Sequence, residues 1–275
     1  MTISQLYLYP IKSLAGIPVA EAQVTDRGFR HDRRYMLVTP KDGQFITIRR
    51  FPKMTLFRPL LAGGGIQVRY ADEPAGRGIT LPLELSQGER LRVTVWEQQV
   101  EALAAGEVAD RWFSERLGVP CRLVYMPDES HRPAKPKMGE LTAGKITSFA
   151  DAYPYLLLSE ASLADLNDRY AGAGPLTMER FRPNLVVRDC PAYAEDELDY
   201  FSINGIRFRG VENCARCNVP NVDPATGEVS PLGEPLRTLA GYRRWAGKVW
   251  FGRNVVNAGA DAGGVRVGDA VAEER

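Results

Sequence analysis

Cysteine and histidine are scarce in this chain of 275 residues, which contains four cysteines and two histidines. Four cysteines are too few for a disulfide-stabilised scaffold, so we expect a cytoplasmic protein. The amino-terminal segment has no charged head followed by an apolar run and a small-residue cleavage site, which is the pattern of a secretory signal. No stretch of about 18 apolar residues occurs either, so we expect no helix that spans a membrane and no membrane partner.

Positive and negative side chains nearly cancel, because 35 Lys and Arg stand against 34 Asp and Glu. A protein that coats nucleic acid or an anionic membrane carries a large basic excess, so we expect no nucleic-acid partner. P-loop sequences and GxGxxG turns between a strand and a helix are also absent, which disfavours nucleotide binding by those routes. The two histidines, His31 and His131, form no Ser-His-Asp order, and hydrolase chemistry is disfavoured too.

Turn-forming residues are abundant, with 26 glycines and 19 prolines, and they separate short segments of alternating polarity. We predict a hairpin over 34–50, with its loop around Asp42 and Gly43, and a second strand pair over 90–103. About ten short strands at this spacing are typical of a barrel or sandwich rather than of βαβ units. The predicted fold class is therefore mixed α/β and β-rich, with a few helices.

Helical periodicity is confined to three segments, 107–117, 159–170 and 234–246. Gly118 is positioned to end the first helix, and either Ser159 or Ser162 to cap the second. Pro235 falls in the first turn of the third segment, and Gly247 follows its end. We therefore expect three helices in an otherwise β-type chain.

Proline, glycine and charged residues concentrate in the loop 127–144, which is the best candidate for a domain boundary. We expect an N-terminal β-rich domain over 1–126 and a C-terminal mixed domain over 127–272. The sequence contains neither an internal repeat nor a low-complexity linker that would suggest a different division.

The sharpest local motif is the pair Cys214 and Cys217, with Arg216 between them. Structural zinc needs four ligands, and neither a second CxxC nor a nearby HxxxH occurs. A thioredoxin-like disulfide requires a βαβ context, whereas β-type sequence without one precedes this pair. Two hypotheses remain: a pair of buried small side chains, or a thiolate ligand to a metal that a cofactor carries. Arg216 favours the second, because a neighbouring cation lowers the pKa of a thiol.

Basic residues gather in two segments of the chain. Residues 27–53 contain eight Lys and Arg, and residues 235–254 contain five together with no acid. Arg180 and Arg182, two positions apart and followed by Pro183, form a third basic feature. Each is either a solvated face or part of a pocket for an anionic ligand, since arginine binds phosphate through paired hydrogen bonds.

Several of these segments resemble one family, the MOSC proteins. The motifs that carry the resemblance occur in the family's order: YPIKS at 9–13, DRRY at 32–35, RFRPN at 180–184, CARC at 214–217, VDPATGE at 222–228 and VGD at 267–269. The chain is most similar to the branch with an N-terminal MOSC β-barrel domain, which includes the amidoxime-reducing components and their bacterial relatives. The resemblance implies that 1–126 is this N-terminal domain. It also implies that 127–272 is a MOSC β-barrel that binds the molybdenum cofactor, molybdopterin.

The resemblance implies a single protein ligand to molybdenum, the thiolate of Cys217, which would also be the catalytic residue. Lys12 and Ser13, together with Arg34, would contact the phosphate or the pterin of the cofactor. A soft, dithiolene-bound molybdenum suits a thiolate, and cations suit a phosphate. Cys214 is either a packed thiol or a side chain that tunes the metal.

Further contacts with the cofactor are implied by the same resemblance. Arg182 and Asn184 would hold the pterin side, and Ala215 and Arg216 would contribute backbone and charge beside the metal. Asp151 would belong to another segment that lines the cofactor.

The activity implied is that of a molybdenum-cofactor oxidoreductase that reduces small N-hydroxylated compounds, namely hydroxylamines, amidoximes and N-hydroxy bases. The cofactor supplies the redox chemistry, and the protein supplies binding, orientation and electrostatics. Some bacterial relatives carry an iron–sulfur domain with four closely grouped cysteines, which this sequence does not contain. We therefore expect a separate electron-donor protein of the ferredoxin, flavoprotein or cytochrome type.

Two alternatives belong to other functional classes. One is a carrier or sulfur-transfer module that binds or modifies the molybdenum cofactor for another enzyme. The other is a cofactor-free, β-rich interaction protein in which both cysteines of the motif belong to the core. Molybdenum content separates the second from the rest, and release of cofactor to an acceptor separates the carrier from the enzyme.

Overall fold

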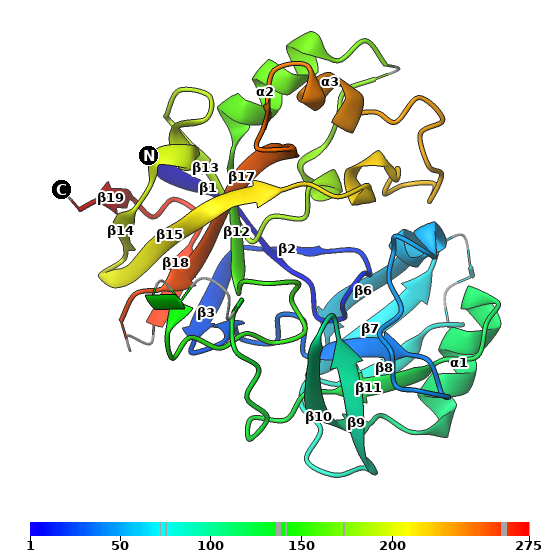
Figure 1. Ribbon diagram of the computed structural model, residues 1–275. Helices are drawn as coiled ribbons and strands as arrows, with labels where there is room; N and C mark the ends of the chain where they lie inside the picture. Colours follow the sequence, from blue (N-terminus) through cyan, green and yellow to red (C-terminus); the bar gives the residue numbers. More distant parts are fainter. Residues whose placement is uncertain are drawn as a thin grey trace.

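The computed structural model describes residues 1–71, 73–74, 76–135, 139–140, 142–172, 174–259 and 263–274 (Figure 1). Strands dominate and helices are few, which confirms the predicted mixed α/β, β-rich fold class. Two units lie side by side: a large unit with strands from 2–29 and 155–273, and a small unit with strands from 35–125. In the described part of the chain, no helix is both long and apolar enough to cross a membrane.

A nine-stranded sheet forms the centre of the large unit. Its strands are β1 (Thr2–Leu8), β2 (Ile17–Val19), β12 (Tyr155–Ser159), β13 (Leu185–Arg188), β14 (Tyr200–Ile203), β15 (Ile206–Ala215), β16 (Arg244–Trp245), β17 (Lys248–Asn257) and β19 (Val271–Glu273). They run in the order β19-β14-β15-β17-β12-β13-β1-β2, and β16 pairs with β17. A small sheet, β18-β3-β4, adds β3 (Glu21–Thr25), β4 (Gly28–Phe29) and β18 (Gly263–Arg266). Tyr155, Phe201 and Phe208 are buried in the core of this unit.

Two further sheets form the small unit. The first has the order β5-β11-β10-β9, with β5 (Tyr35–Val38), β9 (Arg90–Val95), β10 (Gln98–Ala104) and β11 (Arg122–Tyr125). The second has the order β6-β7-β8, with β6 (Phe57–Ala62), β7 (Gly65–Tyr70) and β8 (Ile79–Pro82). Tyr35, Phe57 and Phe113 are fully buried between these elements, so the small unit has a core of its own.

Strand pairing does not follow the predicted linear division after residue 126. β1 pairs with β13 and β3 pairs with β18, so the amino-terminal strands belong to the large unit. Ile3 and Val24 explain this placement, because they are buried in the large core together with side chains from the C-terminal half. The chain then enters the small unit and returns through the loop 127–144, part of which lies outside the described residues.

Two of the three predicted helices are confirmed. α1 (Glu107–Leu117) ends where Gly118 adopts the left-handed conformation, with φ of 75°. α2 (Glu160–Arg169) is capped by Ser159, whose hydroxyl accepts a hydrogen bond from the N–H of Ser162 at 3.0 Å. Four short 3-10 helices are defined within the described residues: η1 (Pro52–Leu56), η3 (Met178–Arg180), η4 (Ala194–Glu197) and η5 (Val219–Asn221).

The helix predicted over 234–246 is wrong for most of its length, because α3 covers only Leu236–Ala240. Beyond it, β16 pairs with the start of β17. Ala246 and Gly247 lie between these two strands with φ of 49° and 72°, as in the tight two-residue turns that join antiparallel strands. Gly247 therefore belongs to a hairpin, since pairing with β17 outcompetes the helical tendency of this segment.

The strand pair predicted over 90–103 is confirmed by β9 and β10. The hairpin predicted over 34–50 is confirmed as far as Ile46. β5 is its first arm, and the second arm pairs with it through the bridge between Val38 and Phe45 and through the N–H of Ile46, which donates to the carbonyl of Leu37 at 2.8 Å. Beyond Ile46, the N–H of Phe51 donates to the carbonyl of Thr47 at 2.9 Å to form a turn. This turn takes the segment out of the sheet and towards the large unit.

Candidate functional site

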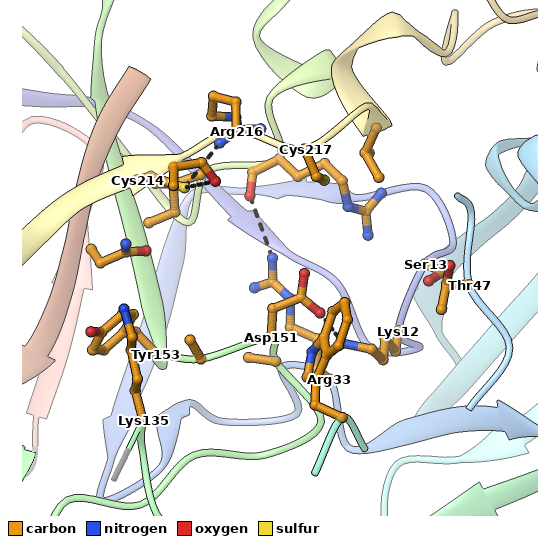
Figure 2. A pocket seen from close by; sticks show the side chains of 18 of the residues that line it. Lys12, Ser13, Arg33, Thr47, Lys135, Asp151, Tyr153, Cys214, Arg216 and Cys217 are labelled. Carbon is orange, nitrogen blue, oxygen red and sulfur yellow. Dashed lines mark hydrogen bonds and ion pairs between the residues drawn. The ribbon is translucent and has the colours of Figure 1, made fainter. Parts of the chain in front are cut away.

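A cavity of about 750 Å³ opens between the two units, and side chains from both of them form its walls. Figure 2 shows Cys214 and Arg216 on one wall, with Lys12, Arg33 and Asp151 on the wall that faces it. Eight of the nine site residues predicted from the sequence line this cavity: Lys12, Ser13, Asp151, Arg182, Asn184, Ala215, Arg216 and Cys217. Arg34 is the exception.

Lys12 is buried beside Asp151 on the loop that follows β1. Its Nζ donates to Oδ1 of Asp151 at 2.5 Å and to the carbonyl of Phe149 at 2.7 Å. Burial disfavours the ammonium ion and lowers the pKa of Lys12 to about 8, although Asp151 opposes this effect. Ser13 has φ of 72°, a left-handed conformation that turns the loop at the cavity wall.

Asp151 accepts from two cations, one on each carboxylate oxygen. Lys12 occupies Oδ1, and Nη2 of Arg49 donates to Oδ2 at 3.1 Å. Burial opposes ionisation, but Lys12 and Arg49 hold the pKa of Asp151 well below its usual range. Arg132 fixes the backbone of this loop by donating to the carbonyls of Ala150 and Asp151 at 2.5 and 2.8 Å. Asp151 is therefore a permanently charged acceptor that positions the two cations.

The titration of Lys12 predicts that the cavity binds a dianion less tightly at alkaline pH. Lys12 is charged below its pKa of about 8 and loses its proton as the pH rises through that value, whereas the arginines stay charged. Between pH 7 and pH 9.5, we expect the dissociation constant of sulfate to rise about tenfold, because the anion loses one charge-assisted hydrogen bond from Lys12. Calorimetric titration of the apoprotein measures this. Lys12→Arg should remove the pH step, and an unchanged wild-type affinity would contradict the prediction.

The structure places Arg33 on the wall of the cavity, whereas Arg34, which was predicted from the sequence, does not line it. Nε of Arg34 donates to the carbonyl of Met126 at 2.9 Å, inside the small unit. Nη1 of Arg33 donates to Asp32 at 2.6 Å and to Oδ1 of Asn184 at 2.8 Å. Arg33 has a left-handed backbone, with φ of 48°, just before β5 begins. This backbone conformation points the side chain of Arg33 away from the direction that Arg34 takes.

Tyr9 is a fully buried ring against which two arginines pack. The guanidinium carbons of Arg33 and Arg182 lie 4.2 and 4.5 Å from its centroid. Arg182 adopts φ of 61°, and burial lowers its pKa to about 10, so it is still charged at neutral pH. Among the described residues, no carboxylate or carbonyl accepts from its guanidinium. Arg182 is therefore available to an anionic ligand.

Arg180 has a structural role, although the sequence pairs it with Arg182. It closes η3, and its guanidinium donates to the carbonyl of Pro220 at 3.1 Å and to Asp223 at 2.8 Å. The two arginines do not share an extended strand, because Arg180 ends η3 and Arg182 has a left-handed backbone. Arg180 instead holds the segment that follows the cysteine motif.

The cysteine motif begins at the end of β15, and Arg216 ties it to its neighbours. The N–H of Arg216 donates to the carbonyl of Val249 at 2.7 Å. Its guanidinium donates to the carbonyl of Phe181 at 2.9 Å and to Sγ of Cys214 at 3.4 Å. Burial nevertheless raises the pKa of Cys214, so Arg216 does not make this sulfur a thiolate at neutral pH. Cys214 is a protonated thiol that supports the loop.

Cys217 is a free, half-buried cysteine that lines the cavity. Arg49 of the small unit reaches towards it. Burial works against the charge of Arg49, but Asp151 and Cys217 together raise the pKa of its guanidinium. Arg49 thus connects the carboxylate on one wall with the cysteine on the other.

Three arginines of the cavity were not identified individually from the sequence: Arg33, Arg49 and Arg132. The signal for the first two was the basic segment 27–53, in which the structure places Arg33 and Arg49 on the cavity and the other basic residues elsewhere. The second basic segment, 235–254, is described throughout, and none of its basic residues lines the cavity.

Comparisons with known proteins found two domain matches and a group of relatives. Residues 1–120 match the MOSC N-terminal beta barrel domain, and residues 144–272 match the MOSC domain. The mitochondrial amidoxime-reducing component 1 of Homo sapiens is 35% identical over 88% of this chain and 72% of that protein. The mitochondrial amidoxime reducing component 2 of Rattus norvegicus is 33% identical over the same shares, 88% and 72%.

A longer relative and one solved structure were also found. The molybdenum cofactor sulfurase of Solanum lycopersicum is 32% identical over 91% of this chain, which is only 32% of the length of that protein. A solution structure of a Bordetella bronchiseptica protein is 23% identical and covers 38% of this chain and 84% of that one. Its TM-score of 0.29 is too low to bear on the fold.

Proposed function

Since this chain belongs to the family that joins a MOSC N-terminal β-barrel domain to a MOSC domain, we propose that it is a molybdenum-cofactor-dependent oxidoreductase that reduces N-hydroxylated compounds. One observation carries the proposal: Cys217 is a free thiol on a cavity that also presents Lys12, Arg33, Arg49 and Arg182. A soft sulfur ligand suits molybdenum, and the cations suit a phosphate. The names of the amidoxime-reducing relatives support the substrate class.

The residues present fit such a cofactor. Arg182 is charged and without a protein acceptor in the described part of the chain, as expected of a side chain that awaits an anion. The cavity volume of about 750 Å³ lies within the usual range for cofactor sites. No three or more His, Cys, Asp or Glu side chains of the described residues converge on a metal position. A metal held by Cys217 would therefore take most of its ligands from the cofactor.

When bound, the cofactor supplies a two-electron reduction in which R–NHOH, two electrons and two protons give R–NH2 and water. In this proposal Cys217 holds the molybdenum, and Ala215 and Arg216 shape the loop beside it. The remaining side chains that hold the phosphate or the pterin are Lys12, Ser13, Arg33, Arg182 and Asn184.

Asp151 acts on cations and not on the substrate proton. Because its pKa is far below neutrality, it cannot donate a proton at pH 7, and it keeps Lys12 and Arg49 in place. Lys12, with a pKa of about 8, is a cavity side chain that can hold and release a proton near neutral pH.

The direct test is expression in a host that makes the molybdenum cofactor, followed by analysis of metal and pterin. We expect stoichiometric molybdenum, and turnover of hydroxylamine, benzamidoxime and an N-hydroxylated purine with reduced methyl viologen as electron source. Fully loaded protein that reduces none of the three would overturn the proposal.

The alternative is a carrier or sulfur-transfer function, which the similarity to a molybdenum cofactor sulfurase supports. Incubation of the loaded protein with a cofactor-free acceptor molybdoenzyme separates the two. Retention of the cofactor together with turnover supports the reductase, whereas transfer to the acceptor without turnover supports the carrier. A separate electron-donor protein and a cytoplasmic location remain predictions.

A further inference from the structure

Trp96 occupies an unfavourable backbone position on the hairpin of β9 and β10. Val95 pairs with Gln98, so Trp96 and Glu97 alone form the turn. Trp96 is the first residue of this two-residue turn and has φ of 57°, a position that glycine, asparagine or aspartate normally fills. A bulky aromatic residue with a left-handed backbone is uncommon, and such outliers cluster at ligand-binding sites.

The ring of Trp96 is held in place on the wall of the cavity. The guanidinium carbon of Arg49 lies 4.5 Å from the ring centroid, and the ring of Phe45 packs against it at 5.0 Å with a tilt of 59°. Because Arg49 also donates to Asp151, a single side chain connects the indole of Trp96 with the ion pairs of Asp151. Even so, 45% of Trp96 stays accessible.

Folding does not explain this arrangement. A tryptophan that contributes to stability is normally buried, whereas this residue is nearly half exposed and stands where glycine would relieve the turn. Trp96 lines a cavity that is otherwise rich in charged side chains. An aromatic face in such a setting binds flat, conjugated ligands by stacking.

We propose that Trp96, supported by Arg49 and Phe45, forms an aromatic subsite that selects flat, conjugated N-hydroxylated compounds over small aliphatic ones. This inference rests on the proposed reductase function and adds the residue that determines its selectivity. Trp96 contacts the body of the substrate and takes no part in the chemical step.

The test compares two substrates, benzamidoxime and hydroxylamine, in the cofactor-loaded enzyme and its variants. For Trp96→Gly we expect the ratio of their kcat/KM values, benzamidoxime over hydroxylamine, to fall about tenfold, which is the upper part of the range for one aromatic contact. Trp96→Phe keeps an aromatic face and should hold the ratio within about threefold. Because glycine suits the left-handed turn, Trp96→Gly should fold with a Tm close to that of the wild type.

Trp245→Ala is the matched control. Trp245 is similarly exposed, at 43%, and lies on another hairpin outside the cavity. Its removal should leave the substrate ratio unchanged. A Trp96→Gly ratio equal to that of the wild type, or an equal loss for both substrates with a lowered Tm, would overturn the subsite.

A second measurement does not depend on turnover. Benzamidoxime should quench the intrinsic fluorescence of the wild type and not that of Trp96→Phe, and equal quenching in both would contradict the proposal. Failure of the subsite is distinguishable from failure of the function. A wild type that reduces neither substrate removes the proposed function, whereas an active enzyme with an unchanged ratio removes only the role of Trp96.

Discussion

Cys217→Ser should abolish reduction of N-hydroxylated compounds and release molybdenum from the purified protein. A serine hydroxyl is a hard, weakly acidic ligand, whereas dithiolene-bound molybdenum prefers a soft thiolate. We expect kcat/KM to fall at least about 100-fold. This loss is larger than the loss usually caused by mutating a residue that only supports a metal ligand. Molybdenum content by elemental analysis, measured beside turnover, checks both parts of this result.

The fold should survive this substitution. Cys217 lies in the loop after β15 and is only half buried, so serine creates no void in the core. The free energy of unfolding of the apoprotein should change by less than about 0.5 kcal/mol, as for substitutions away from the core. Urea denaturation of wild type and variant separates loss of the ligand from loss of the fold.

Cys214→Ser is the matched control. Cys214 is a protonated thiol that accepts from Arg216, and a serine hydroxyl also accepts a hydrogen bond there. The activity of Cys214→Ser should fall less than about tenfold, as for a residue that supports a metal ligand without binding the metal. If both serine variants lose molybdenum and activity equally, the assignment of Cys217 as the ligand is wrong.

Arg182→Ala should give a protein that folds normally and purifies largely free of cofactor. Arg182 is charged, packs on Tyr9 and has no acceptor among the described residues, so a bound anion is its natural partner. A charge-assisted hydrogen bond contributes about 1.5–3 kcal/mol, which corresponds to about a 10- to 100-fold loss of cofactor affinity. Pterin content per folded chain is the measurement.

The apoprotein should not lose stability when Arg182 is removed. Its lowered pKa shows that burial disfavours the charged guanidinium, and φ of 61° is unfavourable for any residue with a side chain. Arg182→Gly, which also relieves the backbone, should therefore have a Tm at or above that of the wild type, with the same loss of cofactor.

Arg180→Ala tests the opposite assignment on the same segment. Arg180 donates to Asp223 and to the carbonyl of Pro220, and its loss removes these hydrogen bonds. We expect about 1–3 kcal/mol of destabilisation and a smaller change in pterin content per folded chain. If Arg180→Ala empties the site while Arg182→Ala only lowers Tm, Arg180 and not Arg182 binds the cofactor.

Local patterns predicted well those elements that neighbours in the sequence stabilise. α1 ends at Gly118 because a left-handed residue closes a helix, and the pair β9 and β10 follows from the alternation over 90–103. The predicted helix over 234–246 failed, because a two-residue turn at Ala246 and Gly247 lets the segment pair with β17. Competition with a partner strand is not visible in the local sequence.

Family resemblance selected residues that, with the exception of Arg34, line one cavity. It selected the DRRY segment at 32–35, but the residue that reaches the cavity is Arg33, because its left-handed backbone turns the side chain away from the course that Arg34 follows. The domain division after residue 126 stays a prediction, and the strands of the two units do not follow it. β1 is first in the chain, yet its apolar side chains are buried in the core of the large unit.

The sequence by itself determined which motifs line the cavity: the cysteine motif, the basic RFRPN segment and the YPIKS loop can be recognised without long-range information. Only the tertiary structure decided which of many arginines serve the site, and it added Arg49 and Trp96 from the small unit. The physical reason is that side-chain direction depends on backbone reversals such as those at Arg33 and Arg182. The composition of the cavity depends on how the two units meet.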